Sequence, residues 1–447
     1  MQKNIAIIGG GLVGSILACY LIKRGHKVSI YERRSDMRKA GYIGGRSINL
    51  AISDRGWRAL EKIGLAQAIH QIAIPMRGRY IHNLDGTHAF LPYGKEGQAI
   101  FSLSRGELNK QLVIAAEAAG ANFYFDERIE DIDFEKNSFT TINTHTNATQ
   151  KIEADLIFGA DGAFSAVRGE MQKTPLFNYS QTYESYGYKE LRIPAGENKS
   201  FLTEKNALHI WPRKNFMMIA LPNVDGDFTC TLFAPFAGEV GFDALKTKAD
   251  VQAYFEKHFP TAIPLMPTYL DDFFENPTSY LMTVRCFPWV KNNTVLIGDA
   301  AHGIVPFYGQ GMNCGFEDVR VLDDLIDKYG EDWDAVLKHY EVSRKPNSDA
   351  IAQLALNNYI EMRDLSAQPE FQLRMKIEKH IAAHFPDKFH TLYSMVTFSH
   401  TPYAEAMSRS QKQAALLDKI MQIENIADSW ESPLVLAMAE EWLNNNA

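Results

Sequence analysis

One N-terminal segment, residues 4–32, carries a pattern that few folds can accommodate. An apolar run, NIAIIG, leads into Gly9, Gly11 and Gly14, which have the spacing G-x-G-x-x-G, and an apolar helical segment follows before a second strand-like run ends at Glu32. The first glycine permits a tight turn, the second lets a phosphate group approach the backbone, and the third packs the helix against the strand. The helix N-terminus offers unpaired N–H groups to phosphates, and an acid at the end of the second strand can accept a hydrogen bond from a ribose. The pattern therefore predicts a βαβ unit that binds the ADP half of a dinucleotide.

Length and composition narrow the class of protein. At 447 residues the chain is longer than one hydrophobic core usually serves, so we expect two or three structural units. The content of 46% hydrophobic and 22% charged residues is typical of a soluble globular protein. A net charge of −8 argues against nucleic acid as the main partner, because neutralising phosphates requires a basic surface. The four cysteines are far apart and form no C-x-x-C pair, which fits a cytoplasmic protein and argues against a metal site.

Two later segments favour FAD over NAD as the dinucleotide. Residues 154–168 read as a buried strand that runs into GADG, with Asp161, and then into a helix. Residues 294–299 form a second apolar strand that ends at Asp299, and the glycine-rich loop PFYGQGMN follows at 306–313. An aspartate at a strand end can accept hydrogen bonds from a polyol such as a ribityl chain. The glycines let backbone approach a flat ring, and the next helix points N–H groups at its electron-rich edge. An NAD dehydrogenase does not need these two additional segments.

These three segments are similar, in order and spacing, to the fingerprints of the class A flavoprotein aromatic hydroxylases. Further blocks resemble one family within that class, the kynurenine 3-monooxygenases, and they extend over nearly the whole chain. They read GRSINLAIS at 45–53, RYIH at 79–82, PYG at 92–94, LSRGELN at 103–109, NNYIEMR at 357–363 and LYSMVTF at 392–398. On these blocks the sequence is identified as a member of that family.

The resemblance implies an FAD-dependent monooxygenase that hydroxylates L-kynurenine to 3-hydroxykynurenine with NADPH and O₂, through a flavin C4a-hydroperoxide. The flavin carries the chemistry, so we expect no catalytic side chain. Since the chain has no second complete G-x-G-x-x-G, NADPH is expected to be a transient co-substrate in a surface cleft. The alternatives are a class A hydroxylase acting on another aromatic acid, a flavin-free NAD dehydrogenase, and a binding protein that kept the nucleotide fold.

The resemblance also implies roles for individual residues. Arg79 and Tyr93 would bind the carboxylate of the substrate, and Asn358 and Tyr393 would contact it from C-terminal helices. Asp161 could also cap the helix that follows it, which is compatible with a cofactor contact. The residues expected to contact FAD, from the motif or from the resemblance, are Gly9, Gly11, Val13, Gly14, Glu32, Arg33, Ala51, Arg105, Asp161, Asp299, Gly311, Met312 and Asn313.

The predicted fold class is α/β: a Rossmann-like FAD-binding domain with an inserted antiparallel-sheet substrate domain and a helical C-terminal region. Alternation of apolar and polar residues, as in 185–193 and 227–233, predicts the antiparallel strands. Eukaryotic members of the family carry a C-terminal membrane anchor, whereas residues 410–447 mix polar and apolar side chains, so we expect a soluble, bacterial-type member without the anchor. The predicted boundaries are 1–72, 101–178 and 286–330 for the FAD-binding domain, 73–100 and 179–285 for the substrate domain, and 331–447 for the helical region.

Overall fold

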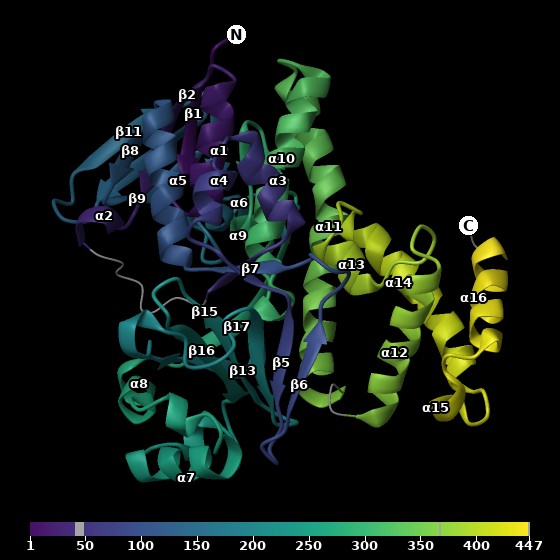
Figure 1. Ribbon diagram of the computed structural model, residues 1–447. Coiled ribbons are helices and arrows are strands. Elements are labelled where there is room, and N and C mark those ends of the chain that lie inside the picture. Colours follow the sequence, from purple (N-terminus) through teal and green to yellow (C-terminus); the bar gives the residue numbers. More distant parts are fainter. Residues whose placement is uncertain (41–48, 366–367, 446–447) are drawn as a thin grey trace.

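A six-stranded sheet assembles the cofactor side of the molecule from separate parts of the chain (Figure 1). The computed structural model describes residues 1–40, 49–365 and 368–445. The strand order is β18-β19-β12-β1-β2-β8, and all neighbours are parallel except the edge pair β18–β19. The strands are β1 (Asn4–Ile8), β2 (Lys27–Glu32), β8 (Asn122–Phe125), β12 (Leu156–Gly159), β18 (Val290–Lys291) and β19 (Thr294–Leu296). Because β1, β12 and β19 are buried on both faces, they read as the continuous apolar runs seen in the sequence.

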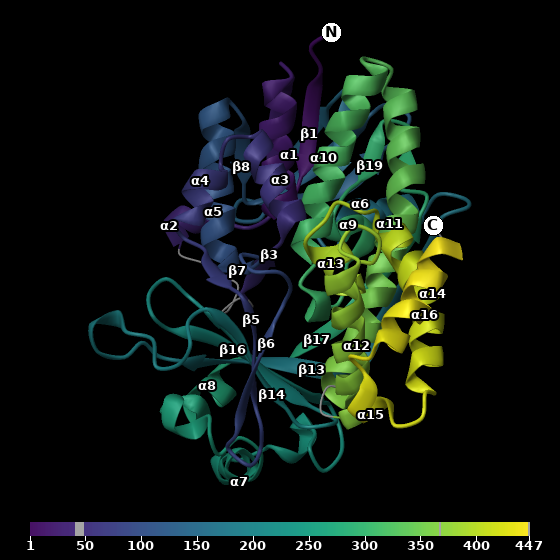
Figure 2. The ribbon, with the colours of Figure 1, turned by 45° about the vertical axis from the view of Figure 1, so that its right-hand side comes forward.

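A seven-stranded sheet, in the order β17-β13-β16-β15-β14-β5-β6, forms the second layer (Figure 2). Its strands are β5 (Gly78–His82), β6 (His88–Pro92), β13 (Asn178–Ile193), β14 (Ala207–Pro212), β15 (Met217–Pro222), β16 (Phe228–Pro235) and β17 (Ser279–Phe287). The antiparallel pairing of β13 with β16 confirms the strands predicted from alternation. However, β5 runs parallel to β14. A parallel pair needs a long connection. Here residues 83–206 connect the two strands, and they include β8 and β12 of the six-stranded sheet.

The two faces of this seven-stranded sheet pack against different partners. One face forms a core with α7 (Lys248–His258) and α8 (Tyr269–Glu275), which lie at the bottom of Figure 1. The other face packs toward α10 (Gly311–Tyr329) and α11 (Trp333–Ile360). Two three-stranded sheets complete the β-structure: β3 (Leu50–Ile52), β7 (Ile100–Leu103) and β4 (Ile74–Met76), and β11 (Thr149–Glu153), β10 (Ser138–Asn143) and β9 (Glu127–Asp133).

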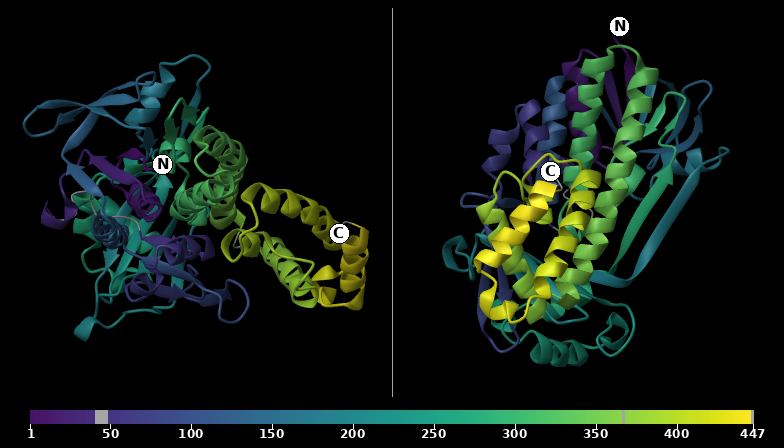
Figure 3. Two further views of the ribbon diagram at one scale, coloured as in Figure 1. Left: turned by 90° about the horizontal axis from the view of Figure 1, so that it is seen from above. Right: turned by 90° about the vertical axis from the view of Figure 1, so that its right-hand side faces the viewer.

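Helices cover the cofactor sheet and make up the C-terminal region. Those that precede α10 on this side of the molecule are α1 (Leu12–Lys23), α2 (Met37–Ala40), α3 (Asp54–Lys62), α4 (Ala66–His70), α5 (Arg105–Ala119), α6 (Ala166–Gln172) and α9 (Asp299–His302). After α11 come a π-helical turn (Glu361–Leu365), α12 (Pro369–His384), α13 (Leu392–Thr397), α14 (Tyr403–Met421), α15 (Ile426–Ser429) and α16 (Pro433–Asn445). The last of these helices have their own apolar core and extend to one side of the molecule (Figure 3).

The arrangement predicted from the sequence is therefore confirmed: an α/β part, a largely antiparallel inserted sheet and a helical C-terminal region. The exact domain boundaries stay a prediction. No helix in the described part of the chain is long and apolar enough to cross a membrane.

Candidate active site

A cavity of about 630 Å³ is lined by residues of both large sheets and of the C-terminal helices. Two of the residues predicted to contact FAD, Gly14 and Asn313, lie outside its lining. The other predicted site residues line it together: Gly9, Gly11, Val13, Glu32, Arg33, Ala51, Arg79, Tyr93, Arg105, Asp161, Asp299, Gly311, Met312, Asn358 and Tyr393. Of the block at 45–53, residues 45–48 fall outside the described residues. The fold thus brings together side chains that are distributed over most of the chain.

The first glycine turn has the shape that a pyrophosphate requires. A Cβ on Gly14 would lie 2.0 Å from the carbonyl oxygen of Gly9, so only glycine lets α1 pack this closely against the turn. A Cβ on Gly11, by contrast, would meet nothing within 4 Å, and the backbone there is open to the cavity. The Glu32 carboxylate is held over this turn because it accepts hydrogen bonds from the N–H groups of Gly10 and Arg34, at 2.9 and 3.0 Å. These features fit the ADP half of FAD.

Asp161 caps the helix that follows it, as one of its two predicted roles requires. One carboxylate oxygen accepts a hydrogen bond from Ser165 Oγ at 2.6 Å, and the other accepts from the backbone N–H of Ala166 at 2.6 Å. Burial raises the pKa of this carboxyl, and the bond from Ser165 offsets part of the rise. Capping is confirmed, while a direct cofactor contact stays a prediction.

Asp299 differs from Asp161 in having its acceptor atoms free toward the cavity. It follows β19, lines the cavity, and makes no side-chain hydrogen bond to another residue in the described ranges. Close by, the N-terminus of α10 presents Gly311 and Met312 to the same space. An acceptor without a partner and a helix N-terminus fit a polyol and an electron-rich ring edge, respectively.

Asn313 acts on the cavity through its neighbours. Its side-chain amide donates to the carbonyl oxygens of Ala51 and Gly309, both at 2.8 Å, and its Oδ1 accepts from the N–H of Ser53 at 3.0 Å. These three bonds join β3, which contains Ala51, to the glycine-rich loop, which contains Gly309. Ala51 and Gly309 both line the cavity. The side chain therefore holds two parts of the cavity wall together.

The predicted carboxylate anchor lies at an aromatic end of the cavity. The Arg79 guanidinium carbon is 5.8 Å from the ring centroid of Tyr93 and 5.4 Å from that of Tyr393, and the two rings stack at 5.1 Å. The buried Tyr93 hydroxyl has no hydrogen bond of normal geometry to any described residue. Burial raises the pKa of both phenols, so they stay protonated and can donate. In the described ranges, no carboxylate oxygen lies within the 4.0 Å ion-pair limit of Arg79. This end of the cavity is suited to bind an anion.

Asn358 and Tyr308 complete this end of the cavity. Asn358 donates its side-chain amide to the carbonyl of Phe307 at 2.7 Å, so it fixes the turn at the start of the glycine-rich loop. Tyr308, whose ring stacks at 5.8 Å on Tyr393, was not predicted as a site residue. An aromatic side chain inside a glycine-rich loop was the available signal.

The apolar wall of the cavity was also missed. Side chains from β14, β15 and β16 form it, namely Leu208, Met217, Ile219, Leu221 and Phe233. Alternation in the sequence shows that a strand has one buried face but does not show what that face covers.

A buried cluster near α10 could be mistaken for a metal site. Potential ligand atoms of His302, Cys314 and Asp318 lie within 4.8 Å of one another. However, Arg344 donates from Nε to Asp318 at 2.7 Å and from Nη2 to the Cys314 sulfur at 3.4 Å. The guanidinium of Arg344 supplies the positive charge that a metal ion would otherwise provide, which favours a structural role for this cluster.

Comparisons with known proteins agree with this site. The family described as "FAD binding domain" matches residues 2–355. The chain is 48% identical to a kynurenine 3-monooxygenase of Flavobacterium johnsoniae over 97% of each chain, and 45% identical to that of Sus scrofa over 93% of this chain and 88% of the other.

Solved structures share the fold. A 2-methyl-3-hydroxypyridine-5-carboxylic acid oxygenase aligns with a TM-score of 0.68 and 21% identity over 82% of this chain and 94% of that one. A p-nitrophenol 4-monooxygenase of Pseudomonas putida aligns with a TM-score of 0.69 and 16% identity, over 90% of this chain and 98% of the other.

Proposed function

This chain belongs to the kynurenine 3-monooxygenase family of FAD-dependent hydroxylases, and from that premise we propose that it converts L-kynurenine to 3-hydroxykynurenine with NADPH and O₂. The observation that carries the proposal for the substrate is the position of Arg79. A cation enclosed by Tyr93 and Tyr393, with no carboxylate within ion-pair distance in the described ranges, is suited to an anionic ligand group. An amino acid with an aromatic ring at its other end supplies that group and fits the apolar wall.

The protein's own part in the reaction is to bind, orient and exclude water. FAD, when bound, supplies the activation of O₂ that no side chain can provide. The open turn at Gly11, the carboxylate of Glu32 and the free carboxylate of Asp299 would hold this cofactor. Arg79 and Tyr93 would fix the substrate carboxylate, and this sets the distance of the aromatic ring from the α10 N-terminus.

The remaining polar groups of the cavity have a supporting part. The neutral phenols of Tyr93 and Tyr393 can donate hydrogen bonds to a ligand without adding charge to the site. The apolar side chains of β15, such as Ile219 and Leu221, keep water from the space where the ring would lie. We also propose that NADPH binds only transiently at the surface, and that the protein works in the cytoplasm.

The experiment is NADPH oxidation by the purified, flavin-loaded protein with and without L-kynurenine, with the product identified by mass. We expect slow oxidation without substrate and a marked increase with kynurenine that yields 3-hydroxykynurenine. The matched control is 4-hydroxybenzoate, an aromatic acid without the amino-acid group. Equal rates with and without kynurenine, or hydroxylation of 4-hydroxybenzoate alone, would refute the proposed substrate. A colourless protein would refute the flavin requirement.

A further inference from the structure

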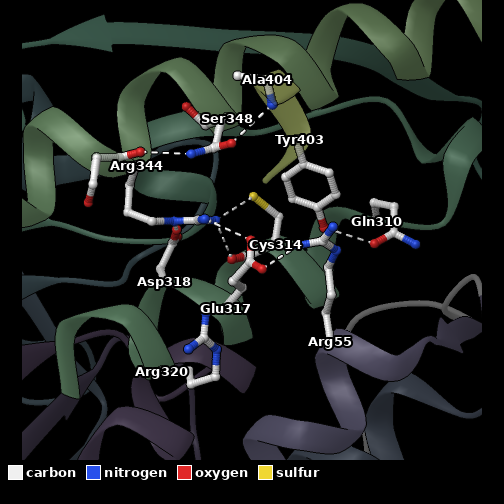
Figure 4. A network of polar contacts seen from close by, with 12 residues as sticks. Arg55, Gln310, Cys314, Glu317, Asp318, Arg320, Arg344, Ser348, Tyr403 and Ala404 are labelled. Carbon is white, nitrogen blue, oxygen red and sulfur yellow. Dashed lines mark hydrogen bonds and ion pairs between the residues drawn. The ribbon is translucent and has the colours of Figure 1, made fainter. Parts of the chain in front are cut away.

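A buried network of charged side chains joins three helices (Figure 4). Helix α3 contributes Arg55, α10 contributes Glu317 and Asp318, and α11 contributes Arg344; all four are almost fully buried. Arg55 and Arg344 both form ion pairs with Glu317, and Arg344 also pairs with Asp318 at 2.7 Å. Burial alone would raise the pKa of Glu317, but the charges of Arg344 and Arg55 hold it below its usual value. The network is therefore charged, with two arginines facing two carboxylates, and its ion pairs fix the three helices relative to one another.

Arg55 uses its other donors to hold a C-terminal helix. Its Nε donates to the carbonyl oxygen of Val396 at 3.0 Å and its Nη2 to that of Met395 at 3.3 Å. Both carbonyls belong to the end of α13, where they lack partners within the helix. The same helix carries Tyr393, which lines the cavity beside Arg79. Arg55 thus fixes the wall of the cavity that faces the substrate.

Tyr403 connects this arginine to the glycine-rich loop. The guanidinium carbon of Arg55 lies 4.0 Å from the centroid of the Tyr403 ring, and the Tyr403 hydroxyl donates to Gln310 Oε1 at 2.9 Å (Figure 4). Tyr403 and Gln310 are both buried. Gln310 lies between Gly309 and Gly311, which line the cavity in the loop predicted to face the flavin. Tyr403 therefore contacts both Arg55, which holds α13, and Gln310, which belongs to the loop that precedes α10.

We propose that Tyr403 is a positioning residue, which through its hydrogen bond to Gln310 keeps the loop at 309–311 in register with α13. This inference rests on the proposed function, because the two walls are those expected to face the flavin and the kynurenine ring. A small shift of the loop would move the reacting atoms apart, and misplacement of about 1 Å is enough to impair a reaction that depends on orientation. NADPH would then be consumed with release of hydrogen peroxide in place of hydroxylated product.

The substitution Tyr403→Phe isolates the hydrogen bond. The phenyl ring keeps its contact with Arg55, and only the hydroxyl that Gln310 accepts from is lost. Tyr254→Phe is the matched control: Tyr254 is a buried tyrosine of α7, remote from the cavity lining, and its hydroxyl has no partner among the described residues. Gln310→Met removes the same bond from the other side with a side chain of similar length.

The first measurement is hydrogen exchange of the full-length protein, which needs no turnover. In Tyr403→Phe we expect the amides of residues 309–313 to exchange about fivefold faster, as loss of one hydrogen bond predicts, while the β-strands of the six-stranded sheet and the Tyr254→Phe control stay at the wild-type rate. Wild-type exchange of this loop in Tyr403→Phe would overturn the proposal. So would a uniform increase over the whole chain, because that would indicate general loss of stability.

The second measurement is the ratio of 3-hydroxykynurenine to peroxide per NADPH oxidised. We expect Tyr403→Phe to raise the peroxide fraction severalfold at unchanged FAD content, and the double variant with Gln310→Met to behave like either single variant, because both remove one bond. Additive effects, or a peroxide fraction equal to that of Tyr254→Phe, would overturn the proposal. If the wild type formed no 3-hydroxykynurenine, the proposed function would fail, and hydrogen exchange would still decide whether Tyr403 holds the loop.

Discussion

Replacing Arg79 by methionine should weaken substrate binding far more than it changes stability. In the free protein the guanidinium lies beside the stacked rings of Tyr93 and Tyr393, and no carboxylate in the described ranges lies within ion-pair distance of it. Glu361, in the turn after α11, contributes an opposing negative charge at longer range. Methionine removes the charge and keeps a long, flexible apolar side chain, so little cavity space is created.

The magnitudes follow from the two environments. Burial disfavours the charged form of Arg79, but the phenols and Glu361 offset this effect and raise the pKa of the guanidinium, so the net effect of the charge on stability is small. We therefore expect Arg79→Met to change the free energy of unfolding by no more than about 1 kcal/mol. The substrate carboxylate, however, would lose a charge-assisted, forked hydrogen bond of about 3 kcal/mol, which weakens kynurenine binding roughly 150-fold. Arg79→Lys keeps the charge without the fork and should lose about tenfold.

The assays are urea unfolding of the free protein and a kynurenine titration followed through the flavin spectrum. The control is Arg77→Met, which removes an exposed arginine two residues earlier and should change neither quantity. FAD content should equal that of the wild type in all variants, because the residue faces the substrate end of the cavity. Wild-type affinity in Arg79→Met would refute the anchor. A loss of several kcal/mol in unfolding free energy would show instead that Arg79 has a structural partner in the free protein.

Two further predictions concern the cofactor and the pH dependence of stability. Asp299→Ala removes an acceptor that is free toward the cavity, so FAD should bind with about 1–3 kcal/mol less free energy, and a flavin content and affinity equal to the wild type would count against the ribityl contact. Burial lowers the pKa of His82 to about 3 and that of His209 to about 4, and the two rings share a 2.8 Å hydrogen bond. In the unfolded chain these two histidines have pKa values of about 6.5. Below that pH the unfolded chain therefore binds more protons than the folded chain. The free energy of unfolding should therefore be highest above pH 6.5 and should fall by about 1.4 kcal/mol per pH unit for each histidine down to pH 4. In His209→Gln the slope of this decrease should be smaller. A free energy that stays constant between pH 6.5 and 5 would contradict this reasoning.

The sequence by itself determined the parts of the site that lie close together along the chain. Gly9, Gly11 and Gly14 are separated by one or two residues, so the turn, the open backbone and the close helix contact follow from local geometry. Asp161 and Asp299 each follow a short apolar strand, and parallel strands bring such ends to one edge of a sheet. Local patterns of this kind fix secondary structure and the end of a strand at which a side chain appears.

Only the tertiary structure decided which distant segments form each wall. The stacking of Tyr93 on Tyr393, the parallel pairing of β5 with β14, and the ion pair between Arg55 and Glu317 each join residues that are far apart in sequence. Alternation predicts that a strand has a buried face, and an arginine in an apolar block suggests a polar partner, but neither pattern identifies the partner. That choice depends on the packing of the whole core, where burial of a charge or an aromatic ring is favourable only when its partner is already in place.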